Sequence, residues 1–206
     1  LKAVTEQFAF RVNDYYLSLI DWANPACPIR RLIIPHPDEL EGWGRLDPSN
    51  EQAYTVLPGL EHKYHSTVLL LVSNVCEGIC RYCFRKRVFI EPQKEALRNV
   101  PAAVEYIAAH PEITNVLLTG GDPLMLTTRK LERIISELRR IDHVQIIRIG
   151  TRMPVFNPYR ILDDPSLPEM ISRYSLPNKR IYVMTHFCHP RELTDTACKG
   201  INTLLR

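Results

Sequence analysis

Three cysteines within eight residues are the side chains of this sequence best placed to do chemistry. Cys76, Cys80 and Cys83 stand four and three residues apart, directly after the apolar run 68–72. Three thiolates can hold three irons of a four-iron cluster, which leaves the fourth iron open to a small molecule. The spacing therefore predicts an iron–sulfur site at the end of a buried strand.

A zinc site, or a set of unrelated buried thiols, is the alternative. Structural zinc takes four ligands, usually in two separated pairs, and no second pair of cysteines stands at a fitting distance. His65 could supply a fourth ligand, but it precedes the apolar run and so lies at the other end of the predicted strand. The local spacing favours the cluster and leaves zinc open.

Basic residues accompany the cysteines. Arg81 lies inside the motif, and Arg85, Lys86 and Arg87 follow it. Positive charge lowers the pKa of nearby thiols and stabilises an anionic cluster, so we expect these side chains to support the site. An ordinary solvated basic face is the alternative.

Four apolar segments are predicted to be the strands that position these residues. They cover residues 68–72, 115–119, 144–149 and 181–185, with helical patterns between them. Alternating strands and helices predict parallel strands joined by right-handed crossovers. The loops that follow the strands should therefore meet at one edge of the sheet, where sites in such folds are built.

These loops contain further candidate binding residues. Gly120, Gly121 and Asp122 follow the second strand, Arg152 follows the third, and His186 follows the fourth. Paired glycines let backbone amides approach a ligand closely, and a neighbouring carboxylate can orient it. Most such triplets are simple turns, so the indication comes from their place beside the cysteine loop.

The first part of the chain differs in character. Residues 1–22 have apolar residues at helical spacing and predict one amphipathic helix, whereas prolines recur from residue 24 to residue 58. We therefore divide the chain into residues 1–66, a helical and extended segment that wraps a larger body, and residues 67–206, the core.

Composition narrows the class of protein. The chain has 206 residues, of which 45% are hydrophobic, and this is enough for one sizeable core. A net charge of +3 without a basic tail does not indicate nucleic-acid binding, and no apolar run approaches membrane-spanning length. Six cysteines, three of them clustered, suit a reducing compartment, so we expect a cytoplasmic protein.

Four motifs, in order and at similar spacing, resemble the lysine 2,3-aminomutase family. These are radical S-adenosylmethionine enzymes that also use pyridoxal phosphate. The motifs are Cys76-x-x-x-Cys80-x-Tyr82-Cys83-x-Arg85, Thr119-Gly-Gly-Asp122, Arg148-Ile-Gly-Thr-Arg152 and Thr185-His-Phe-Cys-His189-Pro. The resemblance makes zinc a remote alternative. It implies an α/β fold: a partial radical-SAM (β/α) barrel of about four parallel βα units, preceded by a helical and proline-rich segment.

The resemblance also implies roles for the cofactor-binding residues. The ligands of a [4Fe-4S] cluster would be Cys76, Cys80 and Cys83. The methionyl part of S-adenosylmethionine would be held by Gly120, Gly121 and Asp122, its carboxylate by Arg152 and its adenosyl part by His186.

Two residues would act on the substrate side. Arg85 matches an arginine that binds the substrate carboxylate, and a planar guanidinium suits that task. Tyr64 matches a tyrosine close to pyridoxal phosphate. The chain departs from the family at Thr67, where an arginine is frequent, and at Cys188, where an asparagine is common.

The implied function is that of an isomerase. It would move the α-amino group of a lysine-like amino acid to the β-carbon through a 5′-deoxyadenosyl radical, with an external electron donor and as a homo-oligomer. A radical enzyme without pyridoxal phosphate and a non-catalytic iron–sulfur module are the alternatives. The lysine that binds pyridoxal phosphate in the family lies beyond the region matching Arg206, so we expect an amino-terminal part of a longer enzyme.

Overall fold

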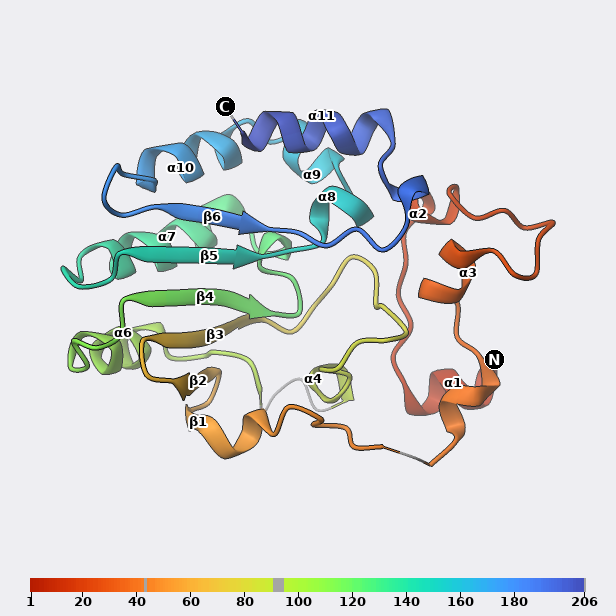
Figure 1. Ribbon diagram of the computed structural model, residues 1–206, viewed down its shortest axis with the longest axis horizontal. Coiled ribbons are helices and arrows are strands. Elements are labelled where there is room, and N and C mark those ends of the chain that lie inside the picture. Colours follow the sequence, from red (N-terminus) through yellow and green to blue (C-terminus); the bar gives the residue numbers. More distant parts are fainter. Residues whose placement is uncertain (43, 91–94, 206) are drawn as a thin grey trace.

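The four predicted strands form one parallel sheet. The computed structural model, which describes residues 1–42, 44–90 and 95–205, places them side by side in chain order (Figure 1). They are β3 (Thr67–Ser73), β4 (Asn115–Gly120), β5 (Ile146–Gly150) and β6 (Ile181–Met184). The sheet is not closed, so the predicted fold class, a partial barrel of four parallel βα units, is confirmed.

Two more strands extend this sheet beyond β3. β1 (Thr55–Leu57) and β2 (Leu60–Tyr64) form a hairpin, and β2 pairs antiparallel with β3. Its turn contains Gly59 at a φ of +82°, where a Cβ would lie 2.2 Å from the backbone nitrogen of Leu97. Only glycine fits that position without strain. The proline-rich segment thus continues the sheet, which the sequence pattern did not predict.

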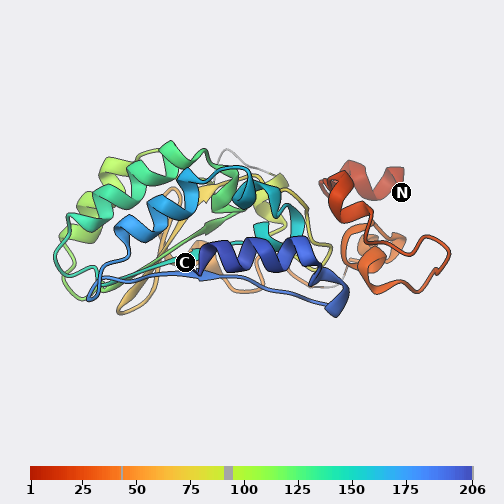
Figure 2. The same cartoon turned by 90° about the horizontal axis from the view of Figure 1, so that it is seen from above.

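Helices that follow the parallel strands pack along one face of the sheet (Figure 2). The longer ones are α6 (Val100–Ala108), α7 (Thr128–Arg139), α10 (Ser166–Tyr174) and α11 (Asp195–Leu204). In α7 the residues Leu131, Ile134, Ile135 and Leu138 are buried, as its apolar spacing predicts. The hydroxyl of Thr127 accepts a hydrogen bond from the backbone of Lys130 and caps this helix.

Short helical turns occupy the loops and the first part of the chain. After the strands come α4 (Arg87–Ile90), η3 (Pro123–Met125), α8 (Met153–Phe156), α9 (Tyr159–Leu162) and η4 (Pro190–Glu192). Before the sheet come α1 (Lys2–Gln7), α2 (Asp14–Leu17), α3 (Pro28–Ile33), η1 (Pro37–Leu40) and η2 (Glu51–Tyr54). None of the helices in these described ranges is long and apolar enough to span a membrane.

The prediction of one helix over residues 1–22 is wrong. The chain forms α1 and α2, with extended backbone between them. There the carbonyl of Arg11 accepts a hydrogen bond from the backbone of Ile79 at 2.9 Å, and the carbonyl of Ala9 accepts one from Arg81 at 3.0 Å. These carbonyls bind the cysteine loop, so they are not available to a helical ladder.

A second apolar core lies beyond the carboxyl ends of the strands. Its fully buried members include Tyr16, Cys27 and Ile29 from the first part of the chain, and Val155 from α8. Cys80 packs against this core. The segment before the sheet therefore packs against one side of the cysteine loop.

Candidate functional site

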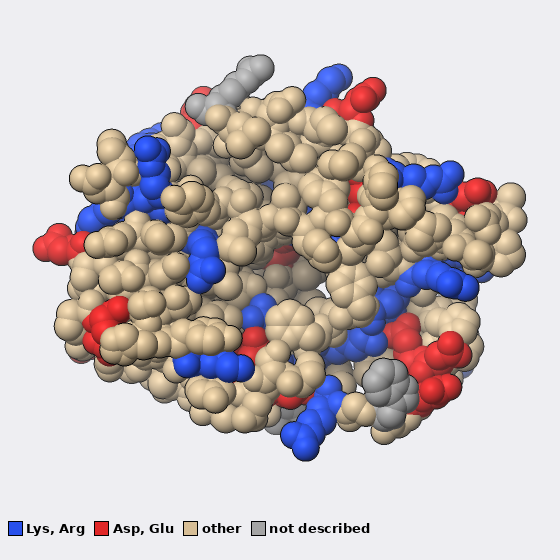
Figure 3. Space-filling model, viewed as in Figure 1, with Lys and Arg blue, Asp and Glu red and all other residues tan. Residues whose placement is uncertain are grey.

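The four loops at the carboxyl ends of β3 to β6 surround one cavity of about 340 Å³. Its lining includes all three motif cysteines together with residues 120–122, 150–152 and 184–186. The face shown in Figure 3 is hollowed near its middle. The structure thus brings together most of the residues singled out by the sequence.

The cysteine loop is held by the first part of the chain. The backbone of Arg81 donates a hydrogen bond to the carbonyl of Leu32 at 2.9 Å, and the side-chain amide of Asn13 donates one to Glu77 at 3.0 Å. Gly78 packs under the ring of Phe156, where a Cβ would lie 2.6 Å from ring carbons. Because these contacts come from both sides, the loop has a defined shape.

The three motif thiols are half-buried. Burial raises the pKa of Cys76 well above its ordinary value, and burial also raises the pKa of Cys83. Arg152 lowers the pKa of Cys76, and Arg85 and Lys86 lower that of Cys83, as expected, but burial outweighs these cations and the net shift of both thiols is upward. Metal binding to thiols releases their protons, so a metal bound at these cysteines would offset the cost of deprotonating them.

The cations beside the loop are neutralised by carboxylates. Arg81 and Lys86 both contact Glu39, at 2.6 and 2.8 Å, and these contacts outweigh burial and hold the pKa of Glu39 at about 2. Arg87 contacts Asp47, Glu51 and Glu95. The predicted basic patch is thus a network of buried or half-buried ion pairs.

The three thiols border a shared space rather than one point. Within residues 1–42, 44–90 and 95–205, no three His, Cys, Asp or Glu side chains come together closely enough to hold a single ion. His65 follows β2 at the far end of the sheet and is no fourth ligand. Thiols set around a cavity fit a polynuclear cluster, in which each thiolate binds its own iron.

The two glycines after β4 let this loop pack on the cysteine loop. Gly120 has a φ of +115°, and a Cβ there would lie 2.3 Å from the carbonyl oxygen of Ser73. Gly121 donates its backbone N–H to that same oxygen at 2.6 Å. A Cβ on Gly121 would lie 2.5 Å from the carbonyl oxygen of Val75. Both residues line the cavity, and their lack of a side chain lets the loop after β4 pack closely on the loop after β3.

Asp122 joins the β4 loop to the β5 loop. Its buried carboxylate accepts hydrogen bonds from the hydroxyl of Thr151 at 2.6 Å and from the backbone of Arg152 at 2.8 Å. It also accepts one from the backbone of Leu124 at 2.9 Å, which caps η3. Burial raises the pKa of this carboxyl group. Asp122 therefore fixes the position of Arg152 as well as lining the cavity.

Arg152 lies among the cysteine motif, η4 and the loop after β6. Its Nη1 donates to Cys80 Sγ at 3.0 Å and to the Tyr82 hydroxyl at 2.8 Å, and its Nε donates to the carbonyl of His186 at 3.0 Å. The ring of His186 is exposed at the mouth of the cavity, 6.5 Å from the ring of Tyr82. The sequence predicted both residues near a cofactor, and the structure places both at the cavity.

Arg85 is buried at the cavity wall with part of its guanidinium available. Its Nε and Nη2 donate to Glu51, with Nη2 at 2.6 Å, and its Nη1 donates to Thr119 Oγ1 at 3.0 Å. An arginine has five N–H groups, so two have no partner among the residues described here. Glu51 takes the Nε–Nη2 edge of the guanidinium, and one N–H on Nη1 and one on Nη2 remain for a further acceptor.

Tyr64 is the one candidate that the structure does not bring to the cavity. It pairs with Thr67 at the start of β3, whereas the cysteine loop follows the end of that strand. Six residues of strand separate the two ends by about 20 Å. Tyr64 is 60% exposed, so it lies on the surface of the described part of the chain.

The sequence pattern did not indicate three residues that hold arginines of the candidate site: Glu51, Thr119 as a partner of Arg85, and Glu192. Glu51 has no local signal, because its partners lie 34 and 36 residues away. Glu192 does have a local signal in the sequence, because it stands three residues after His189 and the two form a capping box around η4.

Comparison with known proteins gives one family match. The model of the Radical SAM superfamily matches residues 70–189, which include the cysteine motif and all four parallel strands except the first residues of β3.

Individual relatives point the same way. The chain is 55% identical over 202 residues to a "Putative L-lysine 2,3-aminomutase" of Aquifex aeolicus, covering 98% of this chain and 54% of the relative. It is 41% identical to an "L-lysine 2,3-aminomutase" of Fusobacterium nucleatum, covering 97% and 46%, and 35% identical to one of Escherichia coli, covering 100% and 59%. The resemblance noted in the motifs is thus confirmed. The chain spans about half the length of these relatives.

Proposed function

Because the chain belongs to the radical SAM superfamily, we propose that it carries the cluster and S-adenosylmethionine site of an amino acid 2,3-aminomutase. The observation that supports this most directly is the shared cavity of Cys76, Cys80 and Cys83, with the guanidinium of Arg85 in its wall. An enzyme of this kind is an isomerase, and its substrate is a small amino acid.

In this proposal the three thiolates hold three irons of a four-iron cluster. When bound, the cluster supplies the electron that cleaves S-adenosylmethionine, and the protein's part is to bind and orient both. Gly120 and Gly121 bring the β4 loop onto the cysteine loop, and Asp122 fixes the β5 loop. These contacts fix part of the cavity wall.

Arg85 is proposed to bind the carboxylate of the substrate. Glu51 and Thr119 hold its guanidinium in place before a ligand arrives, so little side-chain entropy remains to be lost on binding. Its available N–H groups suit the bidentate geometry of a carboxylate. Orientation of this kind lets one hydrogen of the substrate face the reacting centre.

The finer assignment concerns the second cofactor. We propose migration of the α-amino group of a lysine-like substrate to the β-carbon with pyridoxal phosphate, and the names of the relatives support it. No lysine lines the cavity in the described part of the chain. We propose that a residue matching the part of the relatives' sequences that this chain does not cover would hold pyridoxal phosphate.

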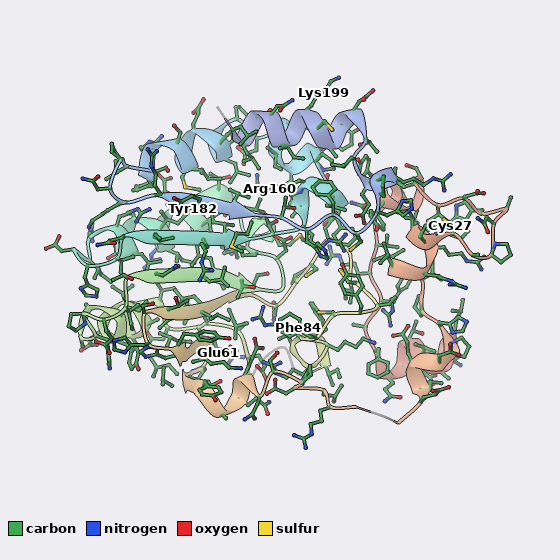
Figure 4. The ribbon with its side chains drawn as sticks, viewed as in Figure 1. Cys27, Glu61, Phe84, Arg160, Tyr182 and Lys199 are labelled. Atoms are coloured by element: carbon green, nitrogen blue, oxygen red, sulfur yellow. The ribbon has the colours of Figure 1, made fainter. Side chains whose placement is uncertain are left out.

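Anaerobic reconstitution with iron and sulfide tests the proposed function. We expect one four-iron cluster per chain, seen by iron analysis and by the electron paramagnetic resonance of the reduced protein. Cys80→Ser should abolish it, whereas Cys198→Ser, at an exposed cysteine on α11, should not change the iron content. Cys27 lies in the segment before the sheet (Figure 4), and Cys27→Ser should also keep the cluster. Stoichiometric zinc without iron would contradict the proposal.

A further inference from the structure

Glu192 is a fully buried carboxylate that is surrounded only by hydrogen-bond donors. It is 0% exposed. Its Oε1 accepts from Arg152 Nη2 at 2.8 Å and from the Tyr16 hydroxyl at 2.6 Å, and its Oε2 accepts from the backbone of Cys188 and of His189. A buried carboxylate without such partners would cost several kcal/mol, so these donors stabilise the charge of Glu192 in the fold.

The same arginine connects this carboxylate to a cluster ligand. Arg152 Nη2 is held by Glu192, while its Nη1 donates to Cys80 Sγ at 3.0 Å. The backbone nitrogen of Arg152 is held by Asp122. The guanidinium therefore has a fixed position between a buried negative charge and a thiol of the motif.

Tyr82 completes the contacts of Arg152 Nη1. Its hydroxyl lies 2.8 Å from Arg152 Nη1 and 2.8 Å from Cys188 Sγ. The backbone of Cys188 in turn donates to Glu192. The contacts among Arg152, Tyr82, Cys188 and Glu192 thus form a closed ring, which restricts each of them more than a single pair would.

We propose that Glu192 is a positioning residue that holds the guanidinium of Arg152 against the sulfur of Cys80 and thereby raises the reduction potential of the cluster. The proposal rests on the proposed function. Reduction adds negative charge to the cluster, and an N–H···S hydrogen bond with a nearby positive charge stabilises that added charge. The ion pair would make the electron transfer into the site more favourable.

A purely structural role for Glu192 is the competing explanation, since it also ties α2 to the loop after β6. The two explanations predict shifts of opposite sign in the reduction potential of the cluster. Removing the negative charge of Glu192, with Arg152 still in place, would raise the potential of the cluster by simple electrostatics. Loss of Arg152 from the sulfur would lower it.

Glu192→Gln separates these outcomes. An amide presents one oxygen and one NH₂ group, so it cannot accept from Arg152 on one side and from two backbone N–H groups on the other. Either way round, its NH₂ group faces a donor. The hydroxyl of Tyr16 can accept a hydrogen bond from an NH₂ group, whereas the backbone N–H groups of Cys188 and His189 cannot. We therefore expect the amide oxygen to face the backbone and the NH₂ group to face Arg152, which releases the guanidinium even though the volume of glutamine is nearly that of glutamate.

The experiment is an anaerobic redox titration of the reconstituted protein, followed by electron paramagnetic resonance. We expect more negative midpoint potentials for Glu192→Gln, Arg152→Met and the double variant. The two single shifts should not add, because both act through the same contact. Tyr16→Phe, which removes one donor to Glu192 without touching Arg152, should lower the thermal stability and leave the potential unchanged.

A potential that is unchanged or less negative in Glu192→Gln would overturn the proposal, and so would full additivity with Arg152→Met. If Glu192→Gln fails to bind iron, the potential of Arg152→Lys tests the proposal instead. Lysine keeps the positive charge but cannot contact Cys80 and Glu192 together, so we expect a more negative potential. An unchanged potential in that variant would also overturn it. A wild-type protein that assembles no four-iron cluster would instead refute the proposed function.

Discussion

The guanidinium of Arg85 and the carboxylate of Glu51 form a buried side-on ion pair, with Nη2 and Oε1 2.6 Å apart. Glu51 also contacts Arg87 at 2.8 Å. Burial alone would raise the pKa of Glu51, but Arg85 and Arg87 outweigh burial and lower it. Glu51 is therefore an ionised group that fixes a second charged residue at the wall of the cavity.

Replacing Arg85 by lysine should weaken substrate binding in the complete enzyme. The ammonium group is a point charge without a fork, so it cannot hold Glu51 and a substrate carboxylate together. We expect the Michaelis constant for the amino acid to rise on the order of tenfold to a hundredfold, since one bidentate charged hydrogen bond is worth about 1.5–3 kcal/mol. Steady-state kinetics at saturating S-adenosylmethionine would measure this.

Arg81→Lys provides a matched control for that experiment. Arg81 pairs with Glu39 and does not line the cavity, so its replacement should leave the Michaelis constant near the wild-type value. Iron content should be the same in Arg85→Lys and in the wild type. Loss of iron with unchanged substrate affinity would mean that Arg85 serves the cluster instead.

Glu51→Gln should destabilise the fold. The change leaves Arg85 and Arg87 without the carboxylate they share, and breaking a buried ion pair costs about 3–5 kcal/mol. Urea denaturation should show a loss of that order. Glu137→Gln, at the exposed pair with Arg140, should cost at most about 0.5 kcal/mol. Equal losses in both variants would contradict the structural role given to Glu51.

The strands and helices of the core were predictable because their signals are local. The apolar run 68–72 and the spacing of Leu131, Ile135 and Leu138 each report burial within one element. The hairpin of β1 and β2 was not predictable in this way. Its strands are short, their burial does not alternate, and their pairing depends on β3 as a template.

The sequence predicted which residues line the cavity better than it predicted what each of them contacts. Gly120, Gly121 and Asp122 lie at the cavity, as their place after a strand indicates, but Gly121 and Asp122 form hydrogen bonds that join neighbouring loops. The partners of Arg85 and Arg152 are distant in sequence, and a buried ion pair leaves no local pattern. The residues that orient a site are thus harder to find from sequence than the residues that line it.

Gly121→Ala should disrupt the junction of two loops. The added methyl group would lie 2.5–2.7 Å from the backbone of Val75, which cannot give way without moving the cysteine loop. We expect a loss of several kcal/mol in stability together with reduced iron loading. Gly150→Ala is the matched control, because a methyl group there meets nothing closer than 3.6 Å and should leave iron content and stability nearly unchanged. Comparable iron loss in both variants would refute the packing argument.

Glu61, on β2 (Figure 4), is a buried acid with an incomplete set of partners. It is 1% exposed, and its Oε1 has no hydrogen-bond partner among the described residues. Arg87 Nη2 lies 3.7 Å from this oxygen and is already bound to Glu51. Burial, followed by repulsion from Glu51, raises the pKa of Glu61 from 4.5 to about 7. The folded protein therefore favours the protonated form of this side chain.

This shift predicts a pH-dependent stability that Glu61→Gln should remove. Between pH 4.5 and 7 the folded state binds the proton more tightly than the unfolded state does, so the contribution of Glu61 to stability is fully present below pH 4.5 and is lost as the pH rises through 7. A shift of this size corresponds to at most about 3 kcal/mol.

Glutamine resembles the protonated acid at every pH. We expect Glu61→Gln to match the wild type at pH 5 within about 1 kcal/mol and to exceed it at pH 8 by roughly 1–3 kcal/mol, measured by urea denaturation at both values. Titration of other groups cancels in the difference between the two proteins. A difference that stays the same at both pH values would show that Glu61 is ionised in the fold, with a partner strong enough to keep it so.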